Sequence, residues 1–228
     1  MEQSLVSKPT SAHVLGRLAM MLPIKLGTKL GQVKIVGNIA ERARFFAKWL
    51  RRPFAIGAIA PSSRRLADAM AANLPTLTPQ DWVVELGGGT GVFTAALLRH
   101  HVPANRLMVV ERDKGLAKTL RKKFPKVLVV QGDATQLPKL AAQHGVSQVA
   151  AVVSGLPLIG MPKPIQARIL AGAFKLLPIG KPFIQFTYAV LPPVAYRRLG
   201  LNGACTKVVW RNIPPASVWR FSKQPKIL

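Results

Sequence analysis

The chain has 228 residues, and its 33 Lys and Arg against 8 Asp and Glu give it a formal net charge of +25. Apolar residues make up 49% of it, which excludes a disordered basic tail and predicts a folded domain with a cationic surface. A single cysteine, Cys205, and four histidines without HExxH spacing exclude a disulfide framework and a cysteine zinc cluster, and they predict no built-in metal site.

A basic amphipathic segment marks the start of the chain. We assign residues 1–54 to an N-terminal helical arm and residues 55–228 to an α/β domain. Apolar residues recur at helical spacing from Ile35 to Leu50, while Lys and Arg fill much of the other face. Such a helix suits an anionic membrane surface, and the residues expected to contact that surface are Lys48, Trp49, Arg51 and Arg52. The alternative is that the helix packs its apolar face on the domain.

Neither a membrane span nor a secretory signal is evident. The longest stretch without a charged residue, 140–162, is interrupted by glycines and prolines, whereas a spanning helix needs about 20 mostly apolar residues. Charged residues also interrupt the apolar region near the N-terminus. We therefore expect a cytoplasmic protein, and its charge predicts an acidic partner.

From residue 82 onward, apolar runs alternate with helical patterns. The expected helices cover 92–101, 114–123 and 164–177. The expected strands cover 82–86, 106–111, 127–131, 148–154, 181–188, 206–212 and 217–222. This alternation predicts an α/β fold with a mostly parallel, seven-stranded sheet, to which the last two strands add an antiparallel edge.

A glycine-rich loop, Glu85-Leu86-Gly87-Gly88-Gly89-Thr90-Gly91, follows the first strand. Its glycines let the backbone turn tightly and approach a ligand. It lacks the third glycine of a dinucleotide fingerprint, because Val92 stands there, and it lacks the lysine of a phosphate-binding loop. Since an acid inside the loop would repel pyrophosphate, we predict a cationic ligand. The alternative is a glycine-rich turn without a function.

Two further acids end the next two strands. Glu111 closes the second strand, where an acid of a doubly wound fold accepts hydrogen bonds from a ribose diol. Asp133 closes the third strand, within reach of the exocyclic amine of an adenine. Because the carboxyl ends of parallel strands meet at one edge of a sheet, we expect Glu85, Glu111 and Asp133 to converge on one crevice.

Together these motifs resemble those of class I S-adenosylmethionine (SAM)-dependent methyltransferases over about residues 55–190. The resemblance implies a Rossmann-like fold, SAM as the cofactor, S-adenosylhomocysteine as its product, and no metal. Glu85 and the glycine loop would hold the methionine end of SAM, Glu111 the ribose and Asp133 the adenine. The complete set assigned to the cofactor is Ser62, Ser63, Glu85, Gly87, Gly88, Gly89, Thr90, Gly91, Glu111, Arg112, Gly132, Asp133, Ala134, Ser154, Gly155 and Leu156.

Three other stretches, 49–64, 154–158 and 186–188, resemble the bacterial phospholipid N-methyltransferases, which methylate phosphatidylethanolamine. That family is itself similar to the ribosomal RNA adenine dimethyltransferases. Adenine N6-methylases typically carry Asn or Asp, and then an aromatic residue, where this chain has Gly155 and Leu158. The polar clamp and the stacking ring for a flipped adenine are therefore missing, which favours an alkyl amine. The alternative is that 154–158 is only a structural turn.

The candidate for orienting the amine is Tyr188, through its hydroxyl group and a ring that can meet a cationic head group. The alternative is a tyrosine that merely ends a buried strand. Tyr196, Arg197 and Arg198 are candidates for contacting a lipid phosphate, with a solvated basic turn as the alternative. Two aromatic-plus-basic pairs, Trp210-Arg211 and Trp219-Arg220, are interpreted as sheet packing rather than membrane contacts.

The sequence thus predicts SAM-dependent N-methylation of phosphatidylethanolamine, and of its mono- and dimethyl forms, towards phosphatidylcholine. The enzyme would act on the inner face of the cytoplasmic membrane, held there peripherally by anionic lipid. An RNA adenine N6-methyltransferase is the alternative, since a charge of +25 suits phosphate backbones equally well. A third reading is a basic binding module without turnover. Nucleic acid is the less favoured partner, and the sequence leaves the oligomeric state open.

Overall fold

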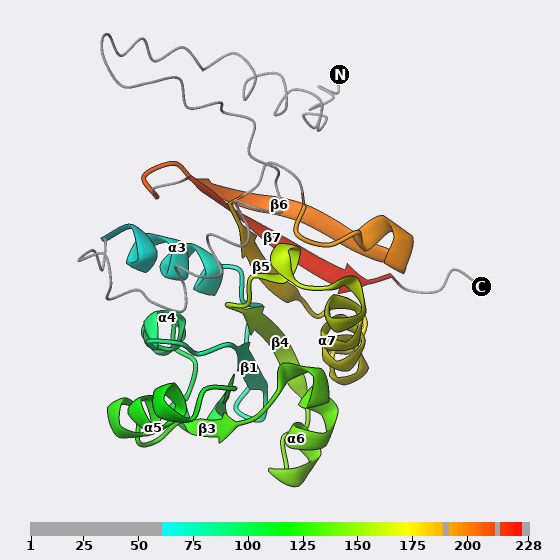
Figure 1. Ribbon diagram of the computed structural model, residues 1–228. Coiled ribbons are helices and arrows are strands. Elements are labelled where there is room, and N and C mark those ends of the chain that lie inside the picture. The colour runs from blue at the N-terminus through cyan, green and yellow to red at the C-terminus, as the bar shows by residue number, and fades with distance from the viewer. Residues whose placement is uncertain (1–60, 189–191, 213–214, 225–228) are drawn as a thin grey trace, which may run out of the picture. The chain divides into compact units, whose positions relative to one another are not determined.

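The computed structural model describes residues 61–188, 192–212 and 215–224 (Figure 1). The chain divides after Val36 into two units, and every described residue belongs to the second. The predicted arm, with Lys48, Trp49, Arg51 and Arg52, lies outside the described residues. Within the described ranges, no helix combines the length and hydropathy that a membrane span requires.

A seven-stranded sheet with the order β3-β2-β1-β4-β5-β7-β6 forms the centre of the fold. Its first five strands are parallel, whereas β7 runs antiparallel to both β5 and β6. The strands are β1 (Trp82–Leu86), β2 (Leu107–Glu111), β3 (Leu128–Gln131), β4 (Val149–Ser154), β5 (Phe183–Thr187), β6 (Leu201–Val209) and β7 (Ala216–Lys223). The predicted Rossmann-like α/β class, with its antiparallel edge, is confirmed.

Helices cover both faces of the sheet (Figure 1). On one face α3, α4 and α5 pack on residues such as Val83, and on the other α6 and α7 pack on residues such as Val84. The helices are α3 (Pro61–Ala71), α4 (Val92–Arg99), α5 (Lys114–Lys123), α6 (Leu137–Gln143) and α7 (Lys163–Leu176), with short 3-10 turns η2 (Ala104–Arg106), η3 (Ala134–Gln136), η4 (Leu158–Gly160) and η5 (Tyr196–Leu199).

The composition of the strands explains this layering. β2 and β4 read LMVVE and VAAVVS, and every residue in them is buried. A strand that is apolar at consecutive positions needs cover on both of its faces, which is typical of a parallel sheet between two helical layers.

Three elements differ from the sequence-based expectation, and one of them is helix α3, which lies in a stretch where no helix was predicted. β6 begins at Leu201, five residues before the predicted start, because pairing with β7 and not an apolar pattern defines this strand: most of its middle residues are exposed. Helix α6 was not predicted. It has only seven residues, and it contains Pro138 near its start. Proline usually indicates the end of a helix in a sequence, although the first turn of a helix tolerates it.

The strand register defines the two edges used below. At the carboxyl edge, where β1–β5 end, Leu86 pairs with Val110 and Ser154, and Glu111 pairs with Gln131. The antiparallel pairing of Thr187 with Ser217 brings the start of β7 to the same edge. The opposite edge, where the parallel strands begin, is called the amino edge.

Candidate active site at the carboxyl edge

The glycine loop connects the end of β1 to the start of α4. Gly87, Gly89 and Gly91 have φ angles of 78°, 52° and 81°, in the left-handed region that glycine adopts without steric cost. A Cβ atom at position 91 would also lie 2.5 Å from Cε2 of Phe124, so this position needs glycine for space as well as for conformation. The loop therefore has the tight, close-packed shape predicted for it.

Glu85 lies at the base of this loop and is completely buried. Its Oε2 accepts a 2.7 Å hydrogen bond from the Thr94 hydroxyl of α4, while its Oε1 has no partner among the described residues. Burial raises the pKa of Glu85 to about 8, the Thr94 hydrogen bond opposes this rise, and the negative charge of Glu111 adds to it. A buried carboxyl with an unused oxygen is suited to a cationic ligand.

Glu111 is held rigidly at the end of β2. Its Oε2 accepts from the backbone N–H of Gly89 at 2.9 Å, and its Oε1 accepts from that of Asp113 at 2.8 Å. The first of these bonds ties the acid to the glycine loop. Each oxygen keeps a further lone pair, and 8% of the residue is exposed, so this carboxylate can accept hydrogen bonds from the hydroxyls of a ligand.

Asp133 follows β3 and begins η3. Its Oδ1 accepts a 2.8 Å hydrogen bond from the backbone N–H of Thr135. That bond, aided by the positive charges of Arg112 and Arg168, holds the pKa of Asp133 below its usual value, so this carboxylate is ionised at neutral pH. The neighbouring Gly132 packs against Leu140, where a Cβ atom would lie 2.7 Å from Cδ1.

The segment from the end of β4, Ser154 to Leu158, packs directly on the glycine loop. A Cβ atom at position 155 would lie 2.8 Å from the carbonyl oxygen of Gly87, and one at position 87 would lie 2.7 Å from Cδ2 of Leu156. The Gly155 N–H also donates to the Leu86 carbonyl at 2.8 Å. Two glycines thus meet backbone against backbone, and neither position can take a side chain without movement.

Leu158 points away from this edge. It is 1% exposed and belongs to the core beneath α7. Gln185 of β5 holds the segment from the same side of the sheet, because its Nε2 donates to the Leu156 carbonyl at 2.9 Å. The Oε1 of Gln185 is buried without a partner among the described residues.

Aromatic rings border the site beside Gly155. Phe93 lies 5.5 Å from Phe186 between ring centroids, and Phe186 meets Tyr188 edge to face at 5.4 Å. Burial raises the pKa of Tyr188 to about 12, and a hydrogen bond with the Asn212 side chain opposes that rise. Tyr188 therefore carries a neutral phenol at neutral pH, which can orient a polar group but cannot act as a base.

The structure does not bring Tyr196, Arg197 and Arg198 to this edge. They form η5, directly before Leu201, and Leu201 pairs with Lys223 at the amino edge. The ring of Tyr196 packs on Phe221 at 5.6 Å, while both arginines are exposed. Their predicted contact with a lipid phosphate is untested, and they are separated from the acids by the length of the strands.

The two serines assigned to the cofactor and the two tryptophans interpreted as sheet packing have different outcomes. Ser62 and Ser63 lie in the first turn of α3, but their side chains are outside the description. Trp219 is half-buried and stacks on Phe221 with a centroid distance of 6.0 Å, which confirms sheet packing for this residue. Trp210, by contrast, is 63% exposed, so the packing interpretation was wrong for it.

Three residues that hydrogen-bond to the candidate site were missed by reading the sequence. Thr94 supplies the hydroxyl that bonds Glu85, Gln185 holds the segment after β4, and Asn212 bonds Tyr188. Gln185 interrupts an otherwise apolar strand, which is a signal that could have identified it. Thr94 and Asn212 lie in ordinary helix and turn sequences, and nothing local marks them.

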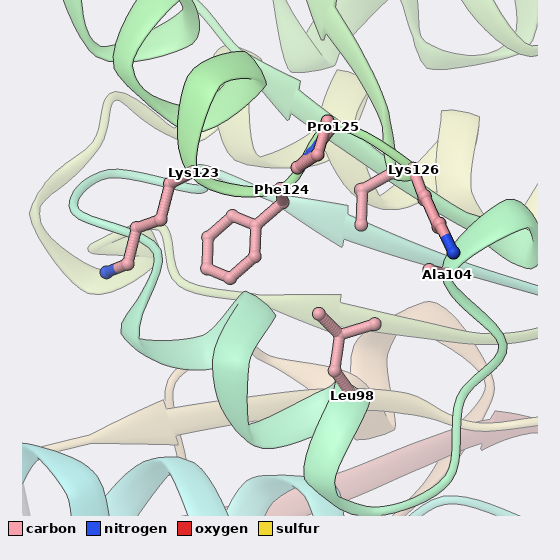
Figure 2. A pocket seen from close by; sticks show the side chains of 7 residues that line it. Leu98, Ala104, Lys123, Phe124, Pro125 and Lys126 are labelled. Atoms are coloured by element: carbon pink, nitrogen blue, oxygen red, sulfur yellow. The ribbon is translucent and has the colours of Figure 1, made fainter.

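An apolar hollow of about 240 Å³ lies outside this site (Figure 2). Figure 2 shows Leu98 and Phe124 turned toward each other across it, with Lys126 beside Ala104. Its lining comprises Leu98, Ala104, Lys123, Phe124, Pro125, Lys126 and Val127. None of these residues is one of the acids or glycines described above, and Lys123 and Phe124 border the outside of the glycine loop at Thr90 and Gly91.

The residues at the carboxyl edge fit SAM. The unused Oε1 of Glu85 suits a cationic group, the fixed Glu111 carboxylate suits the hydroxyls of a ribose, and the ionised Asp133 suits an amine donor. SAM supplies a methyl group on a positively charged sulfur. Within the described ranges, no group of three or more His, Cys, Asp or Glu could hold a metal ion.

Comparison with known proteins gives a family model and several relatives. The family model described as ribosomal RNA adenine dimethylase matches residues 64–198. The ornithine lipid N-methyltransferase of Singulisphaera acidiphila is 32% identical over 178 residues, which cover 77% of this chain and 92% of that protein. A probable ribosomal RNA small subunit methyltransferase A of Natronomonas pharaonis is 35% identical over 126 residues, but these cover only 53% of this chain and 39% of that protein.

Among solved structures, the N-methyltransferase NodS from Bradyrhizobium japonicum WM9, in complex with S-adenosylhomocysteine, superimposes with a TM-score of 0.56. The match covers 78% of this chain and 98% of that one at 13% identity, a level that shows the fold. With the relatives above, the fold and the SAM cofactor expected from the sequence are confirmed.

Proposed function

The chain belongs to the ribosomal RNA adenine dimethylase family of class I SAM-dependent methyltransferases, and we propose that it N-methylates the primary amine of a lipid at a membrane surface. The acceptor is an alkyl amine, as found in phosphatidylethanolamine and in ornithine lipid. The enzyme reaches it peripherally, on the inner face of the cytoplasmic membrane.

The geometry after β4 is the observation that carries this proposal. An adenine methylase needs a polar side chain and an aromatic ring here, to clamp and stack a flipped base. At position 155 a Cβ atom would lie 2.8 Å from the Gly87 carbonyl oxygen, so this backbone has no space for Asn. The side chain of Leu158 is buried in the core instead of facing the site. An alkyl amine needs neither group.

The extent of the matches supports the same proposal. The Singulisphaera relative is named an ornithine lipid N-methyltransferase, and the match spans 92% of its length. The match to the Natronomonas ribosomal RNA methyltransferase spans 39% of that protein, so most of the RNA enzyme has no counterpart in this comparison.

For this reaction the protein mainly has to align the amine nitrogen of the lipid with the methyl group of SAM. SAM would supply the methyl group, and its transfer to the amine would release S-adenosylhomocysteine and one proton, which water would accept. The residues of this chain would hold the two reactants in line. An alkyl ammonium has a pKa of about 10.4 in water, and burial near positive charge lowers it. The neutral phenol of Tyr188 can accept a hydrogen bond from the amine, and the rings of Phe186 and Phe93 favour a cationic head group over water.

RNA adenine N6-methylation is the second candidate. The family match and the net charge of +25 favour it, because a strongly cationic surface binds phosphate backbones. The methyl acceptor therefore has to be identified by experiment.

One labelling experiment tests the proposal. The purified protein is given SAM with a labelled methyl group and one of three acceptors: vesicles with phosphatidylethanolamine, vesicles with ornithine lipid, or ribosomal RNA. We expect label in at least one of the two lipids, and the arm that is labelled identifies the head group. The Glu85→Ala variant serves as the control and should transfer no label. Label in RNA alone, or in no acceptor, would contradict lipid methylation.

A further inference from the structure

Three large apolar side chains are strongly exposed among the described residues: Ile179 at 61%, Leu199 at 48% and Trp210 at 63%. Trp210 is the largest of them and the only aromatic one. Exposed indole is costly in water, but it is favourable at the interface between a lipid bilayer and water. The location of each side chain decides whether it can serve the active site.

The strand register places Trp210 at the carboxyl edge. It follows Val209, which pairs with Ala216, and the neighbouring Ser217 pairs with Thr187 at the end of β5. Ile179 lies between α7 and the start of β5, and Leu199 lies just before Leu201, so both belong to the amino edge. The hairpin register agrees: Leu201, which follows η5, pairs with Lys223, whereas Val209 beside Trp210 pairs with Ala216 at the other end.

The charge around Trp210 is positive. Arg211 and Lys207 are exposed, and neither forms an ion pair within the part of the chain that the structure describes. The sequence contains no Asp or Glu after Asp133, so no acid of the hairpin can offset them. Unpaired Arg and Lys beside an interfacial Trp complement anionic lipid head groups.

The same turn is joined to the active site. Asn212 is 3% exposed and hydrogen-bonds with Tyr188, while the Ser217 hydroxyl donates to the Thr187 carbonyl at 3.5 Å. The exposed pair Trp210-Arg211 is therefore followed at once by a buried residue that contacts the proposed amine-orienting side chain. A surface that binds Trp210 would lie next to the site.

We propose that the β6–β7 turn, through Trp210 and Arg211, is a membrane anchor that docks the carboxyl edge on an anionic bilayer. The inference rests on the proposed lipid substrate, and it names the surface through which this site meets that substrate. Insertion of the indole among the head groups, with Arg211 on lipid phosphates, orients the sheet with Tyr188 toward the membrane.

Vesicle binding tests the anchor without any methyl acceptor. Vesicles of phosphatidylglycerol and phosphatidylcholine contain no primary amine, so the result does not depend on the proposed reaction. We expect Trp210→Ala to weaken sedimentation with these vesicles about five- to tenfold, because an interfacial aromatic contact is lost. Ile179→Ala, equally exposed at the amino edge, should bind as the wild type does. Both variants should keep the SAM affinity of the wild type, which shows that they fold.

Fluorescence provides a second readout. The emission of Trp210 is the difference between the spectra of wild type and Trp210→Phe. When the anionic vesicles are added, this emission should shift to shorter wavelength, and brominated lipid in the vesicles should quench it. Unchanged sedimentation of Trp210→Ala, or an equal loss in Ile179→Ala, would overturn the proposal. So would weaker binding of Trp210→Ala to ribosomal RNA with unchanged vesicle binding, since the turn would then be an RNA contact.

Discussion

At the scale of single residues, the protonation of Glu85 distinguishes this site from a generic glycine-rich turn. A carboxyl that is completely buried beside a second acid holds its proton to a pH of about 8. Among the residues that the structure describes, no group satisfies its Oε1. A cation bound there would favour the ionised form, so ligand binding and proton release are linked.

This linkage predicts a pH dependence. Between pH 4.5 and about 8, Glu85 has lost its proton in the unfolded chain but keeps it in the folded one. The free energy of unfolding should therefore fall as the pH rises through this window. Above pH 8, Glu85 should cause no further change in that free energy. SAM affinity should rise in the same window, by at most about tenfold per pH unit. Calorimetry at pH 6, 7 and 8, in buffers of different ionisation enthalpy, should detect a released proton.

Glu85→Gln is the matched control, since it keeps the shape of the side chain and removes the titration. Its SAM affinity should be weaker at pH 8 and should vary less with pH than that of the wild type. An identical pH profile in both proteins would mean that Glu85 does not ionise on binding.

At the scale of elements, the packing of the segment after β4 is what the proposed preference for an alkyl amine over adenine depends on. η4 turns Leu158 into the core beneath α7, so the position that carries an aromatic ring in adenine methylases is structural here. This placement follows from packing in a core that Leu158 shares with α7, the next helix of the chain, and with Phe183 of the more distant β5.

Leu158→Tyr tests that placement. A larger, polar ring at a position that is 1% exposed should lower the free energy of unfolding by about 1–3 kcal/mol, because the core is overpacked. It should not create RNA methylation. Denaturant unfolding measures the first effect and labelled SAM the second. Ile179→Tyr, at an exposed position, should stay within about 0.5 kcal/mol of the wild type. A stable Leu158→Tyr variant that methylates RNA would contradict this account.

At the scale of the whole molecule, the fold separates one acidic site, in which Glu85 and Glu111 are buried, from a cationic surface. Glu85, Glu111 and Asp133 come from three strands and meet at one edge, while the net charge of the chain is +25. Burial protects interactions inside the site from salt, whereas exposed Lys and Arg are screened.

Salt should therefore separate the two kinds of binding. Raising the ionic strength from 0.1 to 1 M shortens the Debye length from about 10 to 3 Å. We expect binding to vesicles with phosphatidylglycerol to fall steeply and SAM affinity to change much less. Pure phosphatidylcholine vesicles, which carry no net charge, serve as the control. If SAM binding and vesicle binding were equally sensitive to salt, the acids that bind the cofactor would have to be exposed to solvent, which would contradict this account.

The sequence by itself determined the class of fold, the glycine loop and the three acids at the strand ends. These features depend on residues that are adjacent in the chain: consecutive apolar positions make a doubly covered strand, and a tight turn after a strand requires glycine. Such local patterns do not mark β6 or α6. The bounds of β6 depend on its pairing with β7, and α6 is a short helix with proline in its first turn.

Only the tertiary structure decided which groups face each other across the sheet. It set the raised pKa of Glu85 through Thr94 and Glu111, the contact of Gly155 with Gly87, and the buried position of Leu158. It also separated Trp210 from Trp219, two residues with the same kind of neighbour in sequence. Desolvation, steric fit and exposure depend on atoms from distant parts of the chain, which a local pattern does not contain.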